Sequence, residues 1–268
     1  MERIVLAYSG GPASSVAIPW LREHYDAEVV TVTVDLGQSE SLDGIRVRAM
    51  GSGAKRAHVL DRRDVFARHH LLPAVQDGAM DIDSPGALAV LARPLIAHAL
   101  VEIAQIEGAR IVAHAAAGVD DRDRIDAAVK ALDPDMRIID VANLWTWTPL
   151  DLVSMGDYAR ERGIPFSVTP APSVDADASV ARPAAAAPLY ISLEFRAGVP
   201  AKINGVEMDL VELLTSLDTI AASQSVAGSV VLGVAYRALQ ERLGATDVTG
   251  AQKVSVQNGA CEVVNHVE

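Results

Sequence analysis

The chain has 268 residues and a formal net charge of −12 at neutral pH, and hydrophobic residues make up 50% of it. This length allows one large domain or a medium domain with a smaller one, with enough apolar side chains for a substantial core. The negative charge argues against nucleic acid as a partner, because phosphates require Lys and Arg gathered on a positive face. It does not exclude a local basic pocket for a small anion. The single cysteine, Cys261, excludes an internal disulfide framework and a multi-cysteine zinc site.

The sequence shows no signal for secretion or for a membrane span. Met1 is followed almost at once by the apolar run that begins at Ile4, without the charged and apolar regions of a signal peptide. The longest apolar stretch, residues 86–104, is interrupted by charged side chains such as Arg93 and Glu102, so we expect a buried helix there. A cytoplasmic location without a membrane partner is therefore predicted.

Short apolar runs alternate with helical segments up to about residue 170. Ile4–Tyr8 is continuously apolar, which is typical of a parallel strand covered on both faces. Strand–helix alternation of this kind predicts an α/β fold with a doubly wound parallel sheet, in which ligands bind beyond the carboxyl ends of the strands. The predicted strands are 4–8, 28–36, 56–60, 110–113 and 136–141, and the predicted helices are 14–25, 41–52, 64–78, 86–108, 121–132 and 148–163.

The composition changes at residue 170. Residues 170–188 are rich in Ala, Pro, Ser and Asp without clear periodicity, which is typical of a linker. Beyond it, Leu189–Phe195 alternates as a strand, a hairpin signal stands at Asn204-Gly205, and two helices are expected. The last two dozen residues fit either a strand or a frayed tail. We therefore expect a domain over 1–169, a linker over 170–188 and a smaller α+β domain over 189–268.

The strongest local signal for chemistry is the segment Ala7–Ser15, where a buried strand leads into Ser-Gly-Gly before a helix begins. Two glycines let the backbone approach a ligand closely. Hydroxyls and free amides at the start of a helix present donors to an anion, and the helix dipole assists. Pyrophosphate is the expected guest. A plain tight turn capped by Ser14 is the alternative.

Several segments, in order and spacing, resemble argininosuccinate synthases, which belong to the ATP-pyrophosphatase (PP-loop) superfamily. The resemblance covers roughly residues 3–240. It implies a fold like that of adenine nucleotide alpha hydrolases, ATP and Mg²⁺ as cofactors, a small-molecule substrate and a homo-oligomer. The segments are AYSGG from Ala7, VTVDLGQ to Gln38, LARPLIA from Leu91, VAHAAAG from Val112, GIPF from Gly163, PSVD from Pro172 and LEFRAGVPAKING from Leu193.

The resemblance also implies which residues form the site, although it assigns no catalytic residue. Members of this family adenylate the ureido oxygen of citrulline and then displace AMP with the amine of aspartate. The residues implied to bind the nucleotide are Ala7, Tyr8, Ser9, Gly10, Gly11, Ser14, Ser15, Thr33, Asp35 and Ala115, and those implied to bind substrate are Asp120, Asp121, Arg124 and Ser173.

The chain departs from the family pattern at several substrate positions. Ala13 replaces an acidic residue, Ala115 and Ala117 replace a Gly and a Thr, and residues 84–90 hold no equivalent of a Tyr and a hydroxyl residue that contact citrulline. A loop that closes on citrulline is absent, and the C-terminal extension is short. Each missing polar partner costs about 1–3 kcal/mol, whereas micromolar binding amounts to only about 8 kcal/mol.

These departures predict a shortened and divergent member of the family. We expect an ATP-dependent ligase that adenylates a small-molecule carbonyl or ureido oxygen, transfers it to an amine, and is inefficient with citrulline and aspartate. The alternative is a catalytically impaired paralogue that binds a nucleotide or a partner protein.

Three further features allow more than one interpretation. His114 follows a predicted strand, and a hydrogen-bonded structural role is favoured over a general base. Arg93 can steady a phosphate or serve its own helix, and the second is slightly favoured. The charged helix start around Asp120 suits the helix dipole whatever the function. His69 and His70 have no companion at metal-ligand spacing, so no metal site is predicted.

Overall fold

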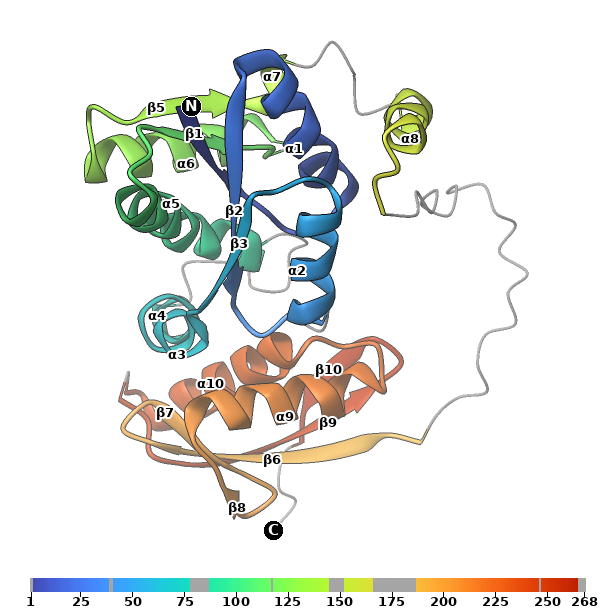
Figure 1. Cartoon of the computed structure of the whole chain (residues 1–268). Coiled ribbons are helices and arrows are strands. Elements are labelled where there is room, and N and C mark those ends of the chain that lie inside the picture. Colours follow the sequence, from blue (N-terminus) through green and yellow to red (C-terminus); the bar gives the residue numbers. More distant parts are fainter. Residues whose placement is uncertain are drawn as a thin grey trace. The chain divides into compact units, whose positions relative to one another are not determined.

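A computed structural model describes residues 2–38, 41–77, 87–116, 118–144, 152–165, 187–245 and 247–264. The chain divides into two compact units (Figure 1). The first, here called the parallel unit, comprises Met1–Arg62 and Ala92–Ala176. The second, the antiparallel unit, comprises Arg63–Leu91 and Asp177–Glu268.

The parallel unit is built on five parallel strands in the order β3-β2-β1-β4-β5. Val5 on the central strand lies opposite Val30 on one side and Val112 on the other. The strand order reverses between β1 and β4, and in open α/β sheets ligands bind at such a point. This sheet, flanked by helices, confirms the predicted α/β class. The strands are β1 (Glu2–Ala7), β2 (Ala27–Asp35), β3 (Arg56–Asp61), β4 (Ile111–His114) and β5 (Arg137–Asp140).

Helices cover both faces of this sheet with separate apolar cores. On one face, α1 (Pro12–Tyr25) and α2 (Leu42–Gly51) pack against side chains such as Ile4 and Leu6. On the other face, α5 (Ala87–Glu107) and α6 (Val119–Leu132) pack against side chains such as Val5. The short α7 (Val141–Leu144) follows β5, and α8 (Leu152–Glu161) contacts α1.

Helix α5 matches the predicted buried helix. By length and composition it is the one helix among the described residues that could cross a membrane. Its residues Ala97, Leu100 and Ala104 are nevertheless fully buried in the core on the sheet. They recur at helical spacing and form one apolar stripe, as in the core helix of a globular fold.

The predicted helix over 64–78 has an irregular centre. The structure has α3 (Arg63–Phe66), the π-helical segment η1 (Ala67–Leu71) and α4 (Leu72–Asp77). Pro73 has no N–H to donate to the carbonyl four residues back, and the N–H of Leu72 bonds instead to the carbonyl of Ala67. The proline at the start of α4 therefore accounts for the wide turn before it.

Residues 63–91, assigned from the sequence to the first domain, group with the second unit. Helix α4 contacts α10, and the side-chain amide of Gln76 donates to the carbonyl oxygen of Gly198 at 3.1 Å. The sequence pattern carried no sign of this exchange, because it arises from long-range packing. Most of the predicted linker, residues 170–186, lies outside the described residues.

The antiparallel unit has strands in the order β10-β9-β6-β7-β8. Along β6, Ile191, Leu193 and Phe195 are buried and their neighbours are not. Phe195 meets Tyr236 of α10 edge-on, with ring centroids 5.6 Å apart. Within the last two dozen residues, for which either a strand or a frayed tail was expected, the described part forms β9 and β10. The elements are β6 (Leu189–Arg196), β7 (Val199–Ile203), β8 (Val206–Glu207), α9 (Leu210–Ala222), α10 (Gly228–Leu243), β9 (Gly250–Gln257) and β10 (Ala260–Val263).

The start of α10 requires glycine. The N–H of Gly228 donates to Asp218 Oδ1 at 2.6 Å, and a Cβ at residue 228 would lie 2.5 Å from that oxygen and 2.7 Å from the backbone nitrogen of Asp218. We therefore expect Gly228→Ala to lower the free energy of unfolding by about 1–3 kcal/mol, as overpacking does. Urea denaturation measures the loss.

Gly233 in the same helix provides the control. A Cβ there would meet only the flexible guanidinium of Arg237, at 3.4 Å. Ala exceeds Gly in helix propensity by about 1 kcal/mol, so Gly233→Ala should be neutral or stabilising. Equal losses in both variants would contradict the steric explanation for Gly228.

Candidate nucleotide site

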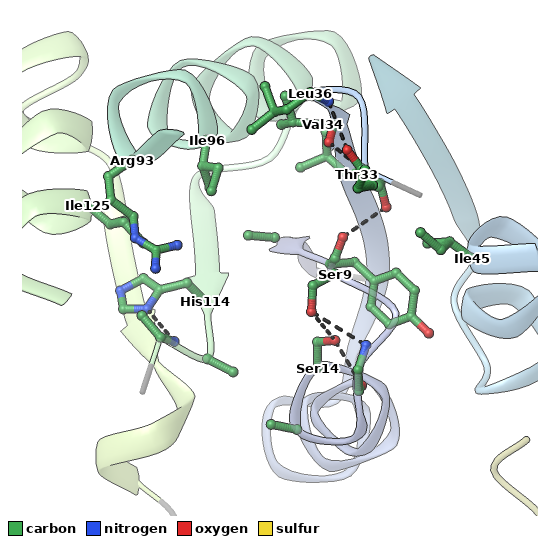
Figure 2. A pocket seen from close by; sticks show the side chains of 18 of the residues that line it. Ser9, Ser14, Thr33, Val34, Leu36, Ile45, Arg93, Ile96, His114 and Ile125 are labelled. Carbon is green, nitrogen blue, oxygen red and sulfur yellow. Dashed lines mark hydrogen bonds between the residues drawn. The ribbon is translucent and has the colours of Figure 1, made fainter. Parts of the chain in front are cut away.

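A cavity of about 510 Å³ lies in the parallel unit, where β1, β2 and β4 end (Figure 2). This volume suits a small ligand or cofactor. Figure 2 shows Arg93 and His114 on one side, Thr33, Val34 and Leu36 on the other, and Ser9 and Ser14 between them. The residues that line the cavity are Ala7, Tyr8, Ser9, Gly11, Pro12, Ala13, Ser14, Val32, Thr33, Val34, Leu36, Gln38, Ile45, Arg93, Ile96, His114, Ala115, Ala116 and Ile125.

Tyr8 and Ser15 anchor the loop after β1 through buried hydrogen bonds. The N–H of Tyr8 donates to the carbonyl of Val32 at 2.9 Å, which extends the β1–β2 pairing by one residue. The Tyr8 hydroxyl and Ser15 Oγ are 2.8 Å apart in the buried interior. These two residues therefore fix the loop that carries Ser9, Gly10 and Gly11.

The two glycines of this loop have different tasks. Gly10 has a φ of +81°, and a Cβ there would lie 2.8 Å from a guanidinium nitrogen of Arg48 and 3.1 Å from Ile45 Cγ1. Both the backbone conformation and the close approach favour glycine. Gly11 is the N-cap residue of α1 and supplies no side-chain cap, and Pro12 follows at the first turn, where proline is pre-organised for a helix.

Hydroxyl groups surround this helix start. Ser14 Oγ donates to the carbonyl oxygen of Gly11 at 3.1 Å and lies 3.3 Å from Ser9 Oγ. The N–H of Gly11 donates to Ser9 Oγ at 3.4 Å, which is a long hydrogen bond. The start of α1 thus presents hydroxyls and a positive dipole end to the cavity, an arrangement suited to phosphate.

Arg93 supplies positive charge to the opposite side of the cavity. Its Nη2 donates to Asp121 Oδ2 at 2.7 Å, and the side chain is 18% exposed. Its Nε is buried and has no hydrogen-bond partner among the described residues. The hydrogen bond from Arg93 lowers the pKa of Asp121 more than burial raises it. Arg93 therefore ties α5 to the first turn of α6, which supports the structural interpretation, and the residue also lines the cavity.

His114 is held on both of its ring nitrogens. It is 1% exposed, its Nε2 lies 2.9 Å from Asp126 Oδ1, and the N–H of Ala116 donates to its Nδ1 at 3.4 Å. Because the N–H of Ala116 makes Nδ1 an acceptor, the hydrogen on Nε2 is the one donated to the carboxylate of Asp126. With both nitrogens engaged, His114 serves the structure of the loop after β4 and is a poor general base.

The end of β2 forms a third side of the cavity. Thr33 Oγ1 donates to the carbonyl oxygen of Tyr8 at 2.9 Å, so the hydroxyl ties β2 to the loop after β1. The buried Asp35 accepts a hydrogen bond from the N–H of Gly37 at 2.9 Å, which closes the turn after the strand. Thr33 lines the cavity and Asp35 does not.

The cavity brings together many of the residues predicted to bind a nucleotide. Ala7, Tyr8, Ser9, Gly11, Ser14, Thr33 and Ala115 line it, whereas Gly10, Ser15 and Asp35 support the loops beside it without lining it. The substrate predictions gather less well. Asp121 pairs with Arg93, while Asp120 and Arg124 are exposed and do not line the cavity. Ser173 lies outside the described residues.

Sequence reasoning missed much of the apolar lining, including Val34, Ile96 and Ile125, and the polar Gln38. In the sequence these valines and isoleucines cannot be distinguished from core residues, because apolar side chains that line a cavity follow the same strand and helix periodicity as side chains that pack in the core. Gln38 ends the VTVDLGQ segment and follows the predicted strand 28–36, and this position at a strand end could have identified it as a site residue.

The described lining offers no carboxylate ligand to Mg²⁺. None of the described lining residues carries a carboxylate, and the described residues contain no cluster of three His, Cys, Asp or Glu suited to a metal. Mg²⁺ often keeps several waters and binds through substrate phosphates. An ion that enters with a nucleotide fits these residues, with Ser9 and Ser14 as nearby hydroxyl oxygens.

Comparison with known proteins places this chain in a family. Residues 3–165 match the family model described as the arginosuccinate synthase N-terminal HUP domain. The chain belongs to the argininosuccinate synthase family. This confirms the resemblance seen in the sequence.

Curated argininosuccinate synthases support the same membership. The protein from Pelotomaculum thermopropionicum is 38% identical over 254 residues, which is 84% of this chain and 63% of that protein. The protein from Dictyoglomus thermophilum is 36% identical over 250 residues, 84% of this chain and 62% of that protein. This argininosuccinate synthase-family chain therefore matches about three fifths of the length of these relatives.

A solved structure, a predicted subunit of tRNA methyltransferase from Methanocaldococcus jannaschii, covers 60% of this chain, and the match covers 76% of that structure. Its sequence identity is 15% and its TM-score is 0.39.

Proposed function

We propose that this chain is an ATP-dependent ligase that adenylates a carbonyl or ureido oxygen of a small molecule and passes the activated group to an amine. The observation that carries this proposal is the cavity at the switch point of the sheet, with the hydroxyls at the start of α1 on one side and Arg93 on the other. Family membership supports ATP as the ligand of such a site.

The residues around the cavity suggest a division of roles. Ser9, Gly11 and Ser14 would hold the phosphates, and Thr33 lies at the strand end where the nucleoside would rest. Arg93 would stabilise negative charge on the phosphate that reacts, because a cation in a partly buried site acts more strongly than one in water. When bound, ATP supplies the adenylyl group and Mg²⁺ shields the phosphate charge. The contribution of this chain is positioning and electrostatic stabilisation.

Citrulline and aspartate are not proposed as the substrate pair. Asp121, a predicted substrate residue, is engaged by Arg93, and Asp120 and Arg124 are exposed beside the cavity lining. The matched region covers about 62% of the relatives' length, so their substrates are not assigned to this chain. A different small molecule fits the proposal better, one whose oxygen attacks ATP and which needs fewer polar contacts with the protein than citrulline does. Homo-oligomer formation and a cytoplasmic location stay predictions.

A nucleotide-binding paralogue without catalysis is the second candidate. The described lining has no carboxylate, and both ring nitrogens of His114 are hydrogen-bonded. An unengaged general base is therefore missing from the described lining. Adenylation by positioning alone does not need such a base, and for this reason the ligase is preferred.

Release of AMP and pyrophosphate distinguishes these candidates. The protein is incubated with ATP, Mg²⁺ and a panel of ureido, amide and carboxylate acceptors with amines, citrulline plus aspartate included. We expect equal amounts of AMP and pyrophosphate with one acceptor, and a rate with citrulline and aspartate lower by at least about 100-fold, equivalent to about 2.7 kcal/mol of transition-state stabilisation.

Two results would count against parts of this proposal. Rapid AMP release that depends on both citrulline and aspartate would refute the substrate statement. ATP binding without AMP release from the whole panel would favour the binding paralogue. Gly10→Asp protein serves as the control for contaminating ligase activity.

A further inference from the structure

The side chain of Gln38 folds back onto the end of β2 at the rim of the cavity. Its Oε1 accepts a hydrogen bond from the N–H of Leu36 at 2.9 Å, and its Nε2 donates to the carbonyl oxygen of Val34 at 3.1 Å. All three residues line the cavity. Figure 2 shows Val34 and Leu36 at its edge. The exposed carboxamide of Gln38 thus forms hydrogen bonds with the backbone N–H of Leu36 and with the backbone carbonyl of Val34 at the same time.

These backbone groups lie on an unpaired edge of the sheet. The carbonyl of Val32 accepts from the chain of β1, at Tyr8, and the carbonyl of Asp35 accepts from Arg62 on the β3 side. Successive residues of a strand direct their backbone groups to opposite sides. Val34 and Leu36 therefore face the β1 side, beyond the point where β1 has ended and the cavity begins.

A ligand for this edge needs an acceptor and a donor on neighbouring atoms. The carboxamide of Gln38 has this pattern in its O–C–N group. Adenine has the same pattern in N1, C6 and the N6 amino group, because N1 accepts and N6–H donates. Gln38 therefore places on the edge of β2 the same pair of hydrogen-bonding groups that an adenine base would bring.

We propose that Gln38 is a displaceable internal ligand that occupies the base-binding edge until the adenine of a nucleotide replaces it. This inference rests on the proposed function, since it takes the cavity to be the nucleotide site. The side chain must leave before the base can bind, so the affinity for nucleotide is reduced by the fraction of molecules in which the edge is closed. Gln38 thus sets the affinity for the base and leaves the phosphate contacts unchanged.

Replacing Gln38 with Ala tests the proposal. We expect Gln38→Ala to bind ATP and adenosine about 3- to 10-fold more tightly than the wild type, because the base no longer competes with two hydrogen bonds. Inorganic pyrophosphate, which lacks a base, should bind both proteins equally. Equilibrium dialysis with each of the three ligands gives the dissociation constants, and thermal unfolding checks that the exposed substitution leaves the fold intact.

Ser14→Ala is the matched variant on the phosphate side. It should weaken ATP and pyrophosphate and leave adenosine unchanged, the opposite pattern to Gln38→Ala. Equal or weaker ATP binding by Gln38→Ala would overturn the inference while leaving the proposed function standing. Absence of ATP binding by the wild type and by both variants would overturn both.

Discussion

Gly10→Asp is expected to weaken ATP binding by at least about 100-fold, about 2.7 kcal/mol. Gly10 has a φ of +81°, and a side chain there would approach Arg48 and Ile45. The left-handed conformation costs a residue with a Cβ roughly 1–2 kcal/mol. The new carboxylate would be forced against the Arg48 guanidinium, so the loop that carries Ser9 and Gly11 would have to shift away from its present position beside the cavity. Filter binding of labelled ATP measures the change.

Two controls separate the causes. Gly10→Ala introduces the Cβ without the charge and should lose a smaller part of the affinity. Gly108→Asp introduces an aspartate at another positive φ, +64°, where a Cβ meets nothing within 4 Å. Gly108 lies between α5 and the amino end of β4, whereas the cavity lies at the carboxyl ends of the strands, so ATP binding should be unchanged. If Gly10→Asp bound ATP like the wild type, the loop after β1 would not be the phosphate site.

Glu107→Ala is expected to lower the free energy of unfolding by about 3 kcal/mol, the lower end for breaking a buried charge pair. The carboxylate is 1% exposed and lies 2.8 Å from Arg56 Nη1, 2.8 Å from His58 Nε2 and 3.2 Å from Arg3 Nη1. It joins the end of α5 to the first residues of β1 and β3. The lower end applies because Arg56 is 58% exposed and can return to water.

Glu102→Ala is the control for this prediction. Glu102 lies on α5 like Glu107 and pairs with Arg62 at 2.6 Å, but its side chain is 32% exposed. Exposed ion pairs of this kind contribute about 0–1 kcal/mol. Urea denaturation of both variants and of Glu107→Gln gives the comparison. Similar small losses in all three would show that the cluster around Glu107 does not stabilise the fold.

The same carboxylate gives a pH dependence. Burial raises the pKa of Glu107, but hydrogen bonds from His58 and Arg56 outweigh it, and the pKa is lowered overall. A lowered pKa in the folded state contributes stability that is present above the pKa of the unfolded chain, near 4.3. We therefore expect wild-type stability to fall as the pH drops below that value, and Glu107→Gln to show a shallower fall.

Much of the parallel unit could be predicted from the sequence, because buried parallel strands are continuous apolar runs and the helices between them carry one apolar stripe. Ile4–Tyr8 and residues 86–108 are clear examples. The helix predicted over 64–78 was assigned to the first domain, whereas residues 63–91 group with the antiparallel unit, because the packing of α4 on α10 depends on contacts distant in the chain. The π-helical segment before Pro73 follows from local chemistry that an average helical period conceals.

The candidate site divides in the same way. Ser-Gly-Gly before a helix predicts a phosphate loop from local chemistry alone, and Ser9 and Ser14 line a cavity in the structure. The pairings of Arg93 with Asp121 and of His114 with Asp126 join residues 28 and 12 positions apart. Such pairs become visible only when α5, β4 and α6 are placed in space. Gln38 acquires its meaning from the unpaired edge of β2, which a linear pattern does not show.

The most direct test of the nucleotide site is a calorimetric titration of the wild-type protein with ATP and Mg²⁺. The arrangement of Ser9, Ser14 and Arg93 around one cavity predicts saturable binding of one ATP per chain, with competition by pyrophosphate. Absence of binding at millimolar ATP would contradict it, and would mean that this member of the family keeps the scaffold without the nucleotide.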